Sequence, residues 1–244
     1  EVIAKYHVVT PEQVNDAFKI AKEAQKKWGA TPWAERVRIT NKAADIIRDR
    51  KMRIAVLMTL EVGKNRMEAL GDAEESADLL SYYAQQMQEA HGYDQPLGKL
   101  SPNENTRDVL RPFGVFSVIG PFNFPMALGA GMSSAALLGG NAVIYKPSDD
   151  APGTAHELYL AYRDAGLPEG VLQIVYGKGP AVGEAMTSNP LCDGTAFTGS
   201  KNVGMKIVKA MHEGRYSKPA LVELGGKNAA FVCASADLDK AAQG

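Results

Sequence analysis

The amino-acid sequence predicts an α/β fold in which a mostly parallel sheet carries helices on both faces and follows a helical N-terminal segment. Apolar residues recur at helical spacing through the first ninety positions. From Gly114 onward, short runs rich in β-branched residues alternate with helical stretches. Such alternation is typical of strand–helix–strand crossovers, which build parallel sheets. Between the two halves, residues 94–112 contain Pro, Asn and Gly and predict a hairpin that leaves the body of the domain.

Composition places the chain among ordinary soluble globular proteins. It has 244 residues, of which 45 % are hydrophobic and 23 % charged, and a net charge of −1. No basic stripe indicates nucleic-acid binding, and the apolar runs fall short of the ~20 residues that a membrane helix needs. Two cysteines, Cys192 and Cys233, fit a reducing compartment, so we expect a cytoplasmic protein. The four histidines lie far apart without ligand spacing, so no metal site is expected.

Residues 1–93 are expected to be mainly helical. Thr10, Pro11 and Gln13 provide an N-cap, a proline at the first helical position and a side chain that reaches back, which is a capping box. The pair Thr31-Pro32 repeats the start signal, and Gly92 is expected to end the last of these helices. Two apolar stripes are interpreted as packing surfaces: Val14, Phe18, Ala21, Ala24 and Trp28, then Leu70, Ala73, Ala77, Leu80, Ala84 and Met87.

The second half is expected to supply the sheet. The predicted strands are "GVFSVIG", "AVIYK", "VLQIVYG", "GTAFTGS", "ALVEL" and "AAFVC". Helical stretches lie between most of them, at 126–138, 153–165, 180–188 and 201–212. In parallel sheets, ligands bind beyond the carboxyl ends of the strands. The unusual polar residues of this sequence lie in the loops that follow the strands, so the candidate site is expected there.

Two of these loops combine proline with polar side chains. In "IGPFNFP", Asn123 lies between two phenylalanines, where a buried amide is costly unless it finds partners. It is either a loop cap or a pre-aimed N–H donor for a developing oxyanion. In "YKPSDDAP", Lys146 and Asp149 are either an incidental ion pair on a solvated loop or a pair that holds a ribose by its hydroxyls.

Three further segments contain glycine. The motif "YGKGPAVG" around Gly179 is one residue too long for the dinucleotide fingerprint and indicates only a close approach of the backbone to something flat. In "FTGSKNVG", Ser200 can cap the next helix, which predicts either a plain N-cap or an anion site. In "VELGGKN", Glu223 closes a strand that is expected to be buried. A carboxylate there should be solvated, paired or catalytic.

In this order, the motifs resemble those of the aldehyde dehydrogenase superfamily. "PFNFP", "YKPSD", "FTGS" and "VELGGKN" match its motifs, and the likeness covers essentially the whole chain. The resemblance implies a Rossmann-like NAD(P)-binding domain at 113–244 and a helical part of the same domain at 1–93. It also implies that residues 94–112 are an oligomerisation hairpin, and hence that the full-length protein is a homo-oligomer.

The resemblance implies oxidation of an aldehyde. In this family a cysteine thiolate attacks the aldehyde, the hydride of the thiohemiacetal passes to the nicotinamide, and water hydrolyses the thioester. Asn123 would donate to the oxyanion, and Glu223 would be the general base. Cys192 and Cys233 match non-catalytic positions, before and within predicted strands. We therefore expect the nucleophile in a catalytic domain absent from this chain, and no turnover from these residues alone.

The resemblance also implies how the cofactor is held. Lys146 and Asp149 would contact the adenosine ribose, Gly179 would lie against the adenine, and Ser200 would meet the pyrophosphate at the helix that follows. The complete set of implied cofactor contacts is Ile119, Gly120, Pro121, Phe122, Lys146, Ser148, Asp149, Gly179, Phe197, Thr198, Gly199, Ser200, Glu223, Leu224 and Gly225.

Departures from the family pattern refine this expectation. Phe122 stands where many members have Trp, which alters the wall near the substrate. Asp149 replaces the commoner Glu. An acid there should repel a 2′-phosphate of roughly −1.5 to −2 charges, so NAD is favoured and NADP stays the alternative. Retention of Glu223 argues against the CoA-acylating branch. The segment "VGKNRMEALGDAEESADLLSYYAQQM" resembles dehydrogenases of glutamate semialdehyde, the open form of pyrroline-5-carboxylate.

Two alternatives to an enzyme stay open. The chain could be a nucleotide-binding module without catalysis, or a remnant that binds nothing. Stabilisation by saturating NAD would separate these two, because a ligand that binds only the folded state raises stability. If the family's catalytic domain normally covers one face, an apolar patch is expected near residues 223–244.

Overall fold

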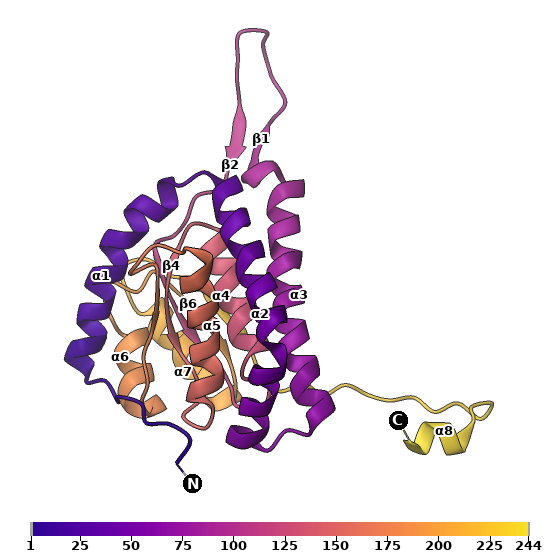
Figure 1. Cartoon of the computed structure of the whole chain (residues 1–244). Helices are drawn as coiled ribbons and strands as arrows, with labels where there is room; N and C mark the ends of the chain where they lie inside the picture. Colours follow the sequence, from indigo (N-terminus) through magenta and orange to yellow (C-terminus); the bar gives the residue numbers. More distant parts are fainter. Residues whose placement is uncertain (1, 244) are drawn as a thin grey trace.

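A five-stranded parallel sheet forms the centre of the computed structural model, which describes residues 2–243 (Figure 1). Its strand order is β5-β4-β3-β6-β7. The strands are β3 (Val115–Ile119), β4 (Ala142–Lys146), β5 (Leu172–Ile174), β6 (Gly194–Thr198) and β7 (Ala220–Glu223). The chain starts at the middle strand, builds outward to β5, and then returns to the other side of β3. In Rossmann-like sheets, a crevice at the carboxyl ends opens where the order reverses, here between β3 and β6.

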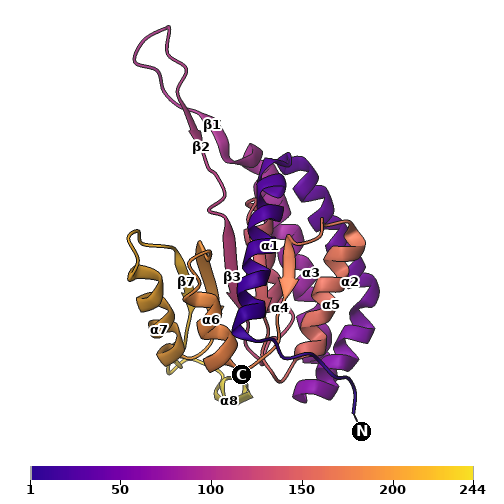
Figure 2. The same cartoon turned by 90° about the vertical axis from the view of Figure 1, so that its left-hand side faces the viewer.

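Helices cover both faces of the sheet (Figures 1 and 2). On one face lie α4 (Ala127–Leu138) and α5 (Pro152–Ala165), with α2 (Trp33–Val62) and α3 (Arg66–Glu89) packed against them. The other face carries α1 (Pro11–Ala30), α6 (Glu184–Thr187) and α7 (Lys201–His212). The predicted fold class is therefore confirmed. None of the described helices is both long and apolar enough to cross a membrane.

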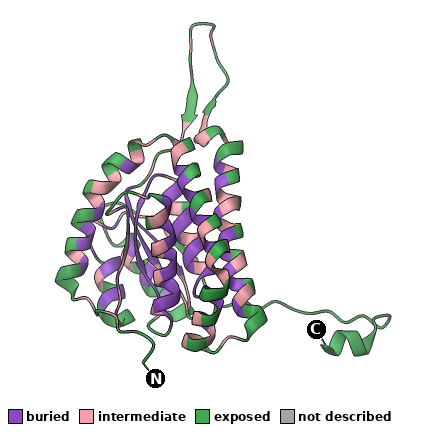
Figure 3. Cartoon of the chain, in the orientation of Figure 1, coloured by how far each residue is buried: buried purple, intermediate pink, exposed green. Residues whose placement is uncertain are grey.

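Side chains alternate along the strands and divide the interior into two cores. Phe116, Val118 and Tyr145 belong to the larger core, under α2 to α5. Ile144 and Phe197 belong to the smaller core, under α1, α6 and α7. Successive side chains of a strand point to opposite faces, so the middle strands are buried on both sides (Figure 3). This burial fixes the register of the strands whose ends carry the candidate site.

The N-terminal helices largely follow the sequence signals. The Thr10–Gln13 capping box is present at the start of α1. Thr31 does not cap α2: its hydroxyl donates to the Lys27 carbonyl, 3.1 Å away, at the end of α1, and Pro32 precedes α2 without a side-chain bond. The third helix ends at Glu89, before Gly92, because the chain already turns into η1 (His91–Tyr93), where Gly92 has a φ of 74°.

A two-stranded antiparallel hairpin projects from the body (Figures 1 and 2). It consists of β1 (Asp94–Pro96) and β2 (Arg107–Val109), and the Leu97 N–H donates to the Thr106 carbonyl at 2.9 Å. The hairpin predicted for residues 94–112 is present. Its role in oligomerisation stays a prediction.

Two predictions for the second half are corrected. Residues 179–187 form a π-helical turn, η2 (Gly179–Gly183), and then the short α6, instead of one helix over 180–188. No strand forms at "AAFVC": after β7 the chain runs exposed to α8 (Leu238–Gln243), and Cys233 lies in this coil (Figures 1 and 3). A strand forms only where a partner backbone satisfies its hydrogen bonds, and no described residue pairs with this segment.

Candidate functional site

The carboxyl ends of four strands align at one edge of the sheet. Ile119 at the end of β3 pairs with Lys146 at the end of β4, and Thr198 of β6 pairs with Glu223 of β7. The alignment continues into the loops, where the Gly199 N–H donates to the Glu223 carbonyl at 3.1 Å. Neighbouring strands lie about 4.8 Å apart. The loops that carry the predicted site residues therefore start side by side at this edge, where the strand order reverses between β3 and β6.

Lys146 and Asp149 form a half-buried pair after β4. The Lys146 residue is 4 % exposed; its Nζ donates to the Pro147 carbonyl at 2.9 Å and lies 3.5 Å from Asp149 Oδ1. Burial lowers the pKa of the Lys146 ammonium, and the Asp149 carboxylate opposes this shift. The lysine end of the pair is buried and the Asp149 end is exposed, and the ribose contact stays a prediction. An ammonium has three donors, so one remains beyond these two contacts for a hydroxyl of a ligand.

Gly179 and Gly225 face open space. A Cβ atom at either position would meet no heavy atom within 4 Å, and neither glycine has a φ in the left-handed region. The fold itself therefore does not require glycine at these two positions. A surface without side chains suits a flat group that lies directly against the backbone. This observation fits the adenine contact predicted for Gly179.

Ser200 is the N-cap of α7. Its Oγ accepts the Val203 N–H at 3.4 Å, so the predicted cap is present. The helix begins at the carboxyl edge of the sheet, directly after β6. Free N–H groups at a helix start attract anions, and the pyrophosphate contact stays a prediction for this position.

Asn123 is exposed and not buried as the sequence suggested, and its two phenylalanine neighbours are also exposed. The reason is that the β3–α4 loop (residues 120–126) lies on the surface at the carboxyl edge. Within the described chain, the Asn123 carboxamide has no hydrogen-bond partner, so its donors are free for a ligand. The loop cap is therefore not its role here.

Three side chains that hold this loop were missed at the sequence level: Lys64, Asp72 and Tyr145. They contact Asn123, Ala127 and Pro125 from positions 20 to 59 residues away in the chain. No local motif marks such distant contacts. The sequence places Lys64 and Asp72 only within the segment "VGKNRMEALGDAEESADLLSYYAQQM", and nothing in that segment predicts a contact with Asn123.

Glu223 is also exposed, which corrects the expectation of a buried strand end. The physical reason is that β7 is covered on one face only: Ala220 and Val222 pack against the smaller core, whereas Leu221 and Glu223 point to the uncovered face. Glu223 lines a groove of about 1140 Å³ together with Thr198, Leu128 and Met132, and the groove extends to Trp33 near the hairpin base. Asn123 is not among the residues that line it. The start of α4 lies between Asn123 and the groove: Ala127 and Leu128 line the groove, and they directly follow the loop that carries Asn123.

The remaining predicted contacts lie around the same edge but differ in exposure. Phe197 points into the smaller core, so only its backbone faces the edge. Leu224 packs on α7, where a Cβ at Gly204 would come within 2.3 Å of its Cδ2. Gly120 is buried against Tyr145, whose hydroxyl would be 3.0 Å from a Cβ there. Partly exposed or exposed residues complete the set: Ile119, Pro121, Phe122, Ser148, Thr198, Gly199 and Gly225.

The two cysteines do not lie at this edge. Cys192 is buried just before β6 begins, at the opposite edge of the sheet, with its Sγ 3.2 Å from the Gly194 carbonyl. Cys233 is exposed in the coil ten residues beyond Glu223. Neither thiol is held next to the Glu223 carboxylate by a described contact.

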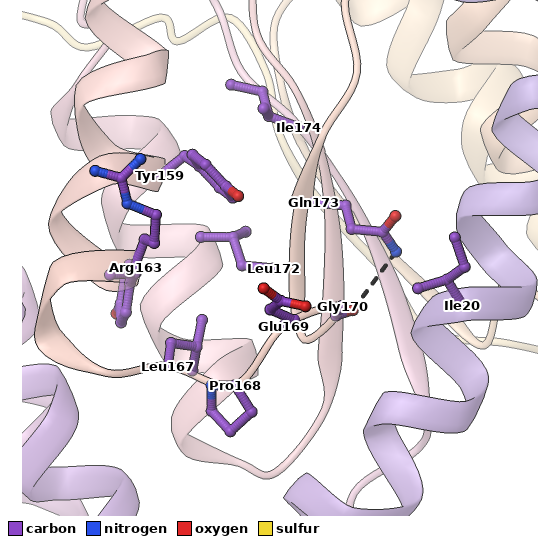
Figure 4. Close-up of a pocket in the computed structure, with 11 residues that line it drawn as sticks. Ile20, Tyr159, Arg163, Leu167, Pro168, Glu169, Gly170, Leu172, Gln173 and Ile174 are labelled. Atoms are coloured by element: carbon purple, nitrogen blue, oxygen red, sulfur yellow. Dashed lines mark hydrogen bonds between the residues drawn. The ribbon is translucent and has the colours of Figure 1, made fainter.

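A second hollow lies at the β5 edge (Figure 4). Its volume is about 510 Å³, and Tyr159 and Arg163 of α5, Gln173 of β5 and Ile20 of α1 face it. Its floor is the loop that enters β5, where the Gln173 amide donates to the Gly170 carbonyl at 3.5 Å. This hollow therefore lies at the amino end of the strand, away from the edge where ligands of parallel sheets bind.

Comparison with known proteins decides the family. The profile of the aldehyde dehydrogenase family matches residues 1–244, which is the entire chain. The chain belongs to the aldehyde dehydrogenase family. The resemblance of its motifs is thereby confirmed, and the family places this chain among relatives that are oxidoreductases.

Individual aldehyde dehydrogenase relatives can be named. A 1-pyrroline-5-carboxylate dehydrogenase of Geobacillus sp. (strain WCH70) is 38 % identical over 247 residues, covering 100 % of this chain and 48 % of the relative. The chain thus spans about half the length of the curated relatives it matches. A Thermus 1-pyrroline-5-carboxylate dehydrogenase solved with bound NAD superposes with a TM-score of 0.86 and 33 % identity, covering 90 % of this chain and 43 % of that one.

A structure of different specificity matches equally well. The NAD-dependent benzaldehyde dehydrogenase of Corynebacterium glutamicum gives a TM-score of 0.90 at 32 % identity, covering 100 % of this chain and 52 % of that one. The family fold is therefore shared by relatives that act on chemically different aldehydes.

Proposed function

We propose that the protein containing this chain oxidises an aldehyde to a carboxylic acid with NAD. The observation that carries the proposal is the common edge at which β3, β4, β6 and β7 end, with Lys146 in register with Ile119 and Glu223 in register with Thr198. Membership of the aldehyde dehydrogenase family supports it over the full chain. NAD is also what the Thermus relative binds.

This chain would supply the dinucleotide site. The free donor of Lys146 and the exposed Asp149 carboxylate suit the two hydroxyls of a ribose, because one group donates and the other accepts. The bare backbone at Gly179 leaves room for the adenine, and the N-terminus of α7 at Ser200 suits the pyrophosphate. Asp149 disfavours a 2′-phosphate, so NAD is preferred over NADP. Bound NAD supplies the hydride acceptor.

The chain would also supply two of the reacting groups. The carboxamide of Asn123 is exposed without a partner, so it can donate to the oxygen of an aldehyde that is becoming an oxyanion. Glu223 is exposed at the groove, so as a carboxylate it can take a proton from water that attacks the thioester. The thiol that forms this thioester would come from a cysteine outside these residues, since Cys192 is buried at the amino end of β6 and Cys233 has no described contact with Glu223.

We propose glutamate semialdehyde as the aldehyde. The support is the 38 % identity to a 1-pyrroline-5-carboxylate dehydrogenase over the whole chain. The benzaldehyde-specific relative makes benzaldehyde the natural competitor in a test. Glutamate semialdehyde should give a kcat/KM at least about a hundredfold above that of benzaldehyde, since a polar site left unpaired costs several kcal/mol. A higher kcat/KM for benzaldehyde than for glutamate semialdehyde would contradict glutamate semialdehyde as the substrate.

Assembly belongs to the same proposal. The exposed leucines of the hairpin, Leu97, Leu100 and Leu110, suit contact with another copy of the protein. We therefore propose a homo-oligomer in which residues 94–112 join subunits.

Glu223→Gln in the full-length protein tests the chemistry. The amide cannot accept a proton, so steady-state NADH formation should fall by about a hundredfold or more. A single burst of NADH, about one per active site, should survive, because the first half of the reaction needs no water. A stopped-flow assay measures both phases.

Three outcomes separate the candidate functions. If Glu223→Gln abolishes the burst as well as steady-state turnover, Glu223 does not act only as the general base for hydrolysis of the thioester. A wild-type protein that binds NAD but oxidises no aldehyde would be a nucleotide-binding module. A protein whose melting temperature does not respond to saturating NAD would contradict the dinucleotide site itself.

A further inference from the structure

Lys64 is a nearly buried cation in the short link between α2 and α3. Its side chain is 8 % exposed, and that of its partner Asp72 is 0 % exposed. Lys64 Nζ lies 3.2 Å from Asp72 Oδ2, donates to the Asn123 carbonyl at 2.8 Å, and sits 3.5 Å from the centre of the Phe124 ring. All the described contacts of this ammonium therefore go to Asp72 and to the loop that carries Asn123.

The ends of the β3–α4 loop are fixed by other groups. Asp72 Oδ1 accepts the Ala127 N–H at 2.7 Å, and the Tyr145 hydroxyl donates to the Pro125 carbonyl at 3.2 Å. Tyr145 can reach the loop only because position 129 is glycine, where a Cβ would be 2.2 Å from its hydroxyl oxygen. These two contacts hold residues 125–127. Neither of them touches Asn123.

The contact from Lys64 is therefore the one described side-chain contact that fixes Asn123 itself. Burial of an ion pair costs desolvation free energy, and a pair of apolar side chains often stabilises a fold at least as well. A buried cation that contacts one carbonyl therefore contributes less to stability than to the direction of that carbonyl, because a charge-assisted hydrogen bond is short and directional. A contact to the carbonyl restrains the backbone of Asn123, and because the rotamers open to a side chain depend on its backbone φ and ψ, it also restricts the directions open to the carboxamide.

We propose that Lys64, held by Asp72, is a positioning residue that aims the Asn123 carboxamide at the developing oxyanion. The proposal rests on the function proposed above, in which Asn123 is the donor. Lys64 touches neither substrate nor cofactor. It acts through the Asn123 main chain, and Asp72 couples it to the start of α4.

A purely structural role would be to join α2 to α3, and the chain offers a matched control for it. Lys51 and Glu74 form an ion pair between the same two helices, with half-exposed side chains. Lys51 has no described contact with the β3–α4 loop. Lys51→Met and Lys64→Met each replace a lysine by a neutral, unbranched side chain, but only the second frees Asn123.

The experiment uses the full-length protein and a double-mutant cycle with Asn123→Ala. Lys64→Met should lower kcat by about tenfold to a hundredfold, as expected for a misplaced catalytic group. The KM for the aldehyde and the Kd for NAD should stay within about twofold, because the ground-state contacts remain. In the Asn123→Ala background, Lys64→Met should have no further effect on kcat. Lys51→Met should behave as wild type.

The outcomes that overturn the inference are distinct from failure of the function. If wild-type protein oxidises aldehydes and Lys64→Met matches Lys51→Met, Lys64 positions nothing. If Lys64→Met lowers kcat equally with and without Asn123, its role is structural. Should Lys64→Met not fold, Asp72→Asn replaces it in the cycle, because the amide keeps an oxygen for the Ala127 N–H while removing the charge that holds Lys64. If wild-type protein oxidises no aldehyde, the function and this inference both fall.

Discussion

At the scale of single residues, the two groups proposed to take part in the reaction are exposed on a buried scaffold. Glu223 and Asn123 are both exposed, whereas the strands beneath them are covered on both faces or, for β7, on one. An exposed carboxylate pays no desolvation cost, so the fold tolerates Glu223 without a partner. The catalytic role proposed for Glu223 then depends on what covers the groove beside it.

Gly179 allows a direct test of the dinucleotide site. Gly179→Val should raise the Kd for NAD by about tenfold or more, because its side chain would occupy the space assigned to the adenine. The free energy of unfolding without NAD should change by less than about 0.5 kcal/mol, because a Cβ there meets no atom of the protein. Calorimetric titration measures the Kd, and urea unfolding measures the stability.

The matched control is Gly98→Val. Gly98 also has open space around its Cβ position, but it lies in the hairpin loop. Its NAD affinity should equal that of the wild type. If Gly179→Val and Gly98→Val bind NAD with equal affinity, the adenine does not lie against Gly179.

At the scale of elements, helix ends connect the site to the rest of the molecule. The Glu61 carboxylate, near the end of α2, accepts the N–H groups of Gly153 and Thr154 at 2.7 and 2.8 Å, and thereby caps α5. The start of α5 follows the loop that carries Lys146 and Asp149. A cap from a distant helix thus holds the end of the loop of residues 147–151 in place, in addition to local turn chemistry.

The α1 capping box gives a stability prediction. Thr10→Ala should lower the free energy of unfolding by about 1 kcal/mol, because the Gln13 N–H loses its acceptor at the helix start. Thr31→Ala is the control, since its hydroxyl bonds only to the Lys27 carbonyl in this region and caps no helix start. Equal losses in the two variants, measured by urea unfolding, would show that the box is not formed.

His156 of α5 predicts a dependence of stability on pH. Its Nδ1 lies 2.9 Å from the Tyr176 hydroxyl. Burial lowers the pKa of the imidazole, Arg163 adds to the shift, and Glu157 opposes it. The fold therefore favours the neutral ring. This contribution to stability is fully present above the ordinary pKa and is lost as the pH falls through the lower, folded-state pKa.

Replacement by glutamine tests this dependence. Between about pH 7.5 and pH 5.5, the wild-type protein should lose more free energy of unfolding than His156→Gln, because only histidine takes up a proton on unfolding in this range. Urea unfolding at both pH values gives the difference. A larger loss in the variant would mean that the imidazole is stabilised in its charged form.

At the scale of the whole molecule, the sequence predicted what depends on local pattern. Runs such as "AVIYK" became buried strands because β-branched residues pack on both faces of a parallel sheet. The Thr10 box and the Ser200 cap also followed from neighbouring residues alone. These are interactions within a few positions of the chain, where propensity and hydrogen bonding act together.

The features that the sequence did not predict depend on distant partners. Burial of Glu223 was expected from its apolar strand, but burial depends on which elements cover each face of β7, and the face with Leu221 and Glu223 lines the groove. "AAFVC" has the composition of a strand without a partner to pair with. Lys64 contacts Asn123 across 59 positions. Within residues 223–244, where an apolar patch was expected, Phe231, Val232 and Leu238 are exposed; that they form one patch stays a prediction.

The most direct test of the shared dinucleotide site is hydrogen–deuterium exchange of the full-length protein with and without saturating NAD. NAD should slow exchange in peptides that cover 119–126, 146–150, 177–183 and 198–204, which form the carboxyl edge of the sheet. Exchange at 167–174, in the hollow at the amino end of β5, should not change. Protection confined to 167–174, or none in the four loops despite NAD binding, would contradict a shared site at that edge.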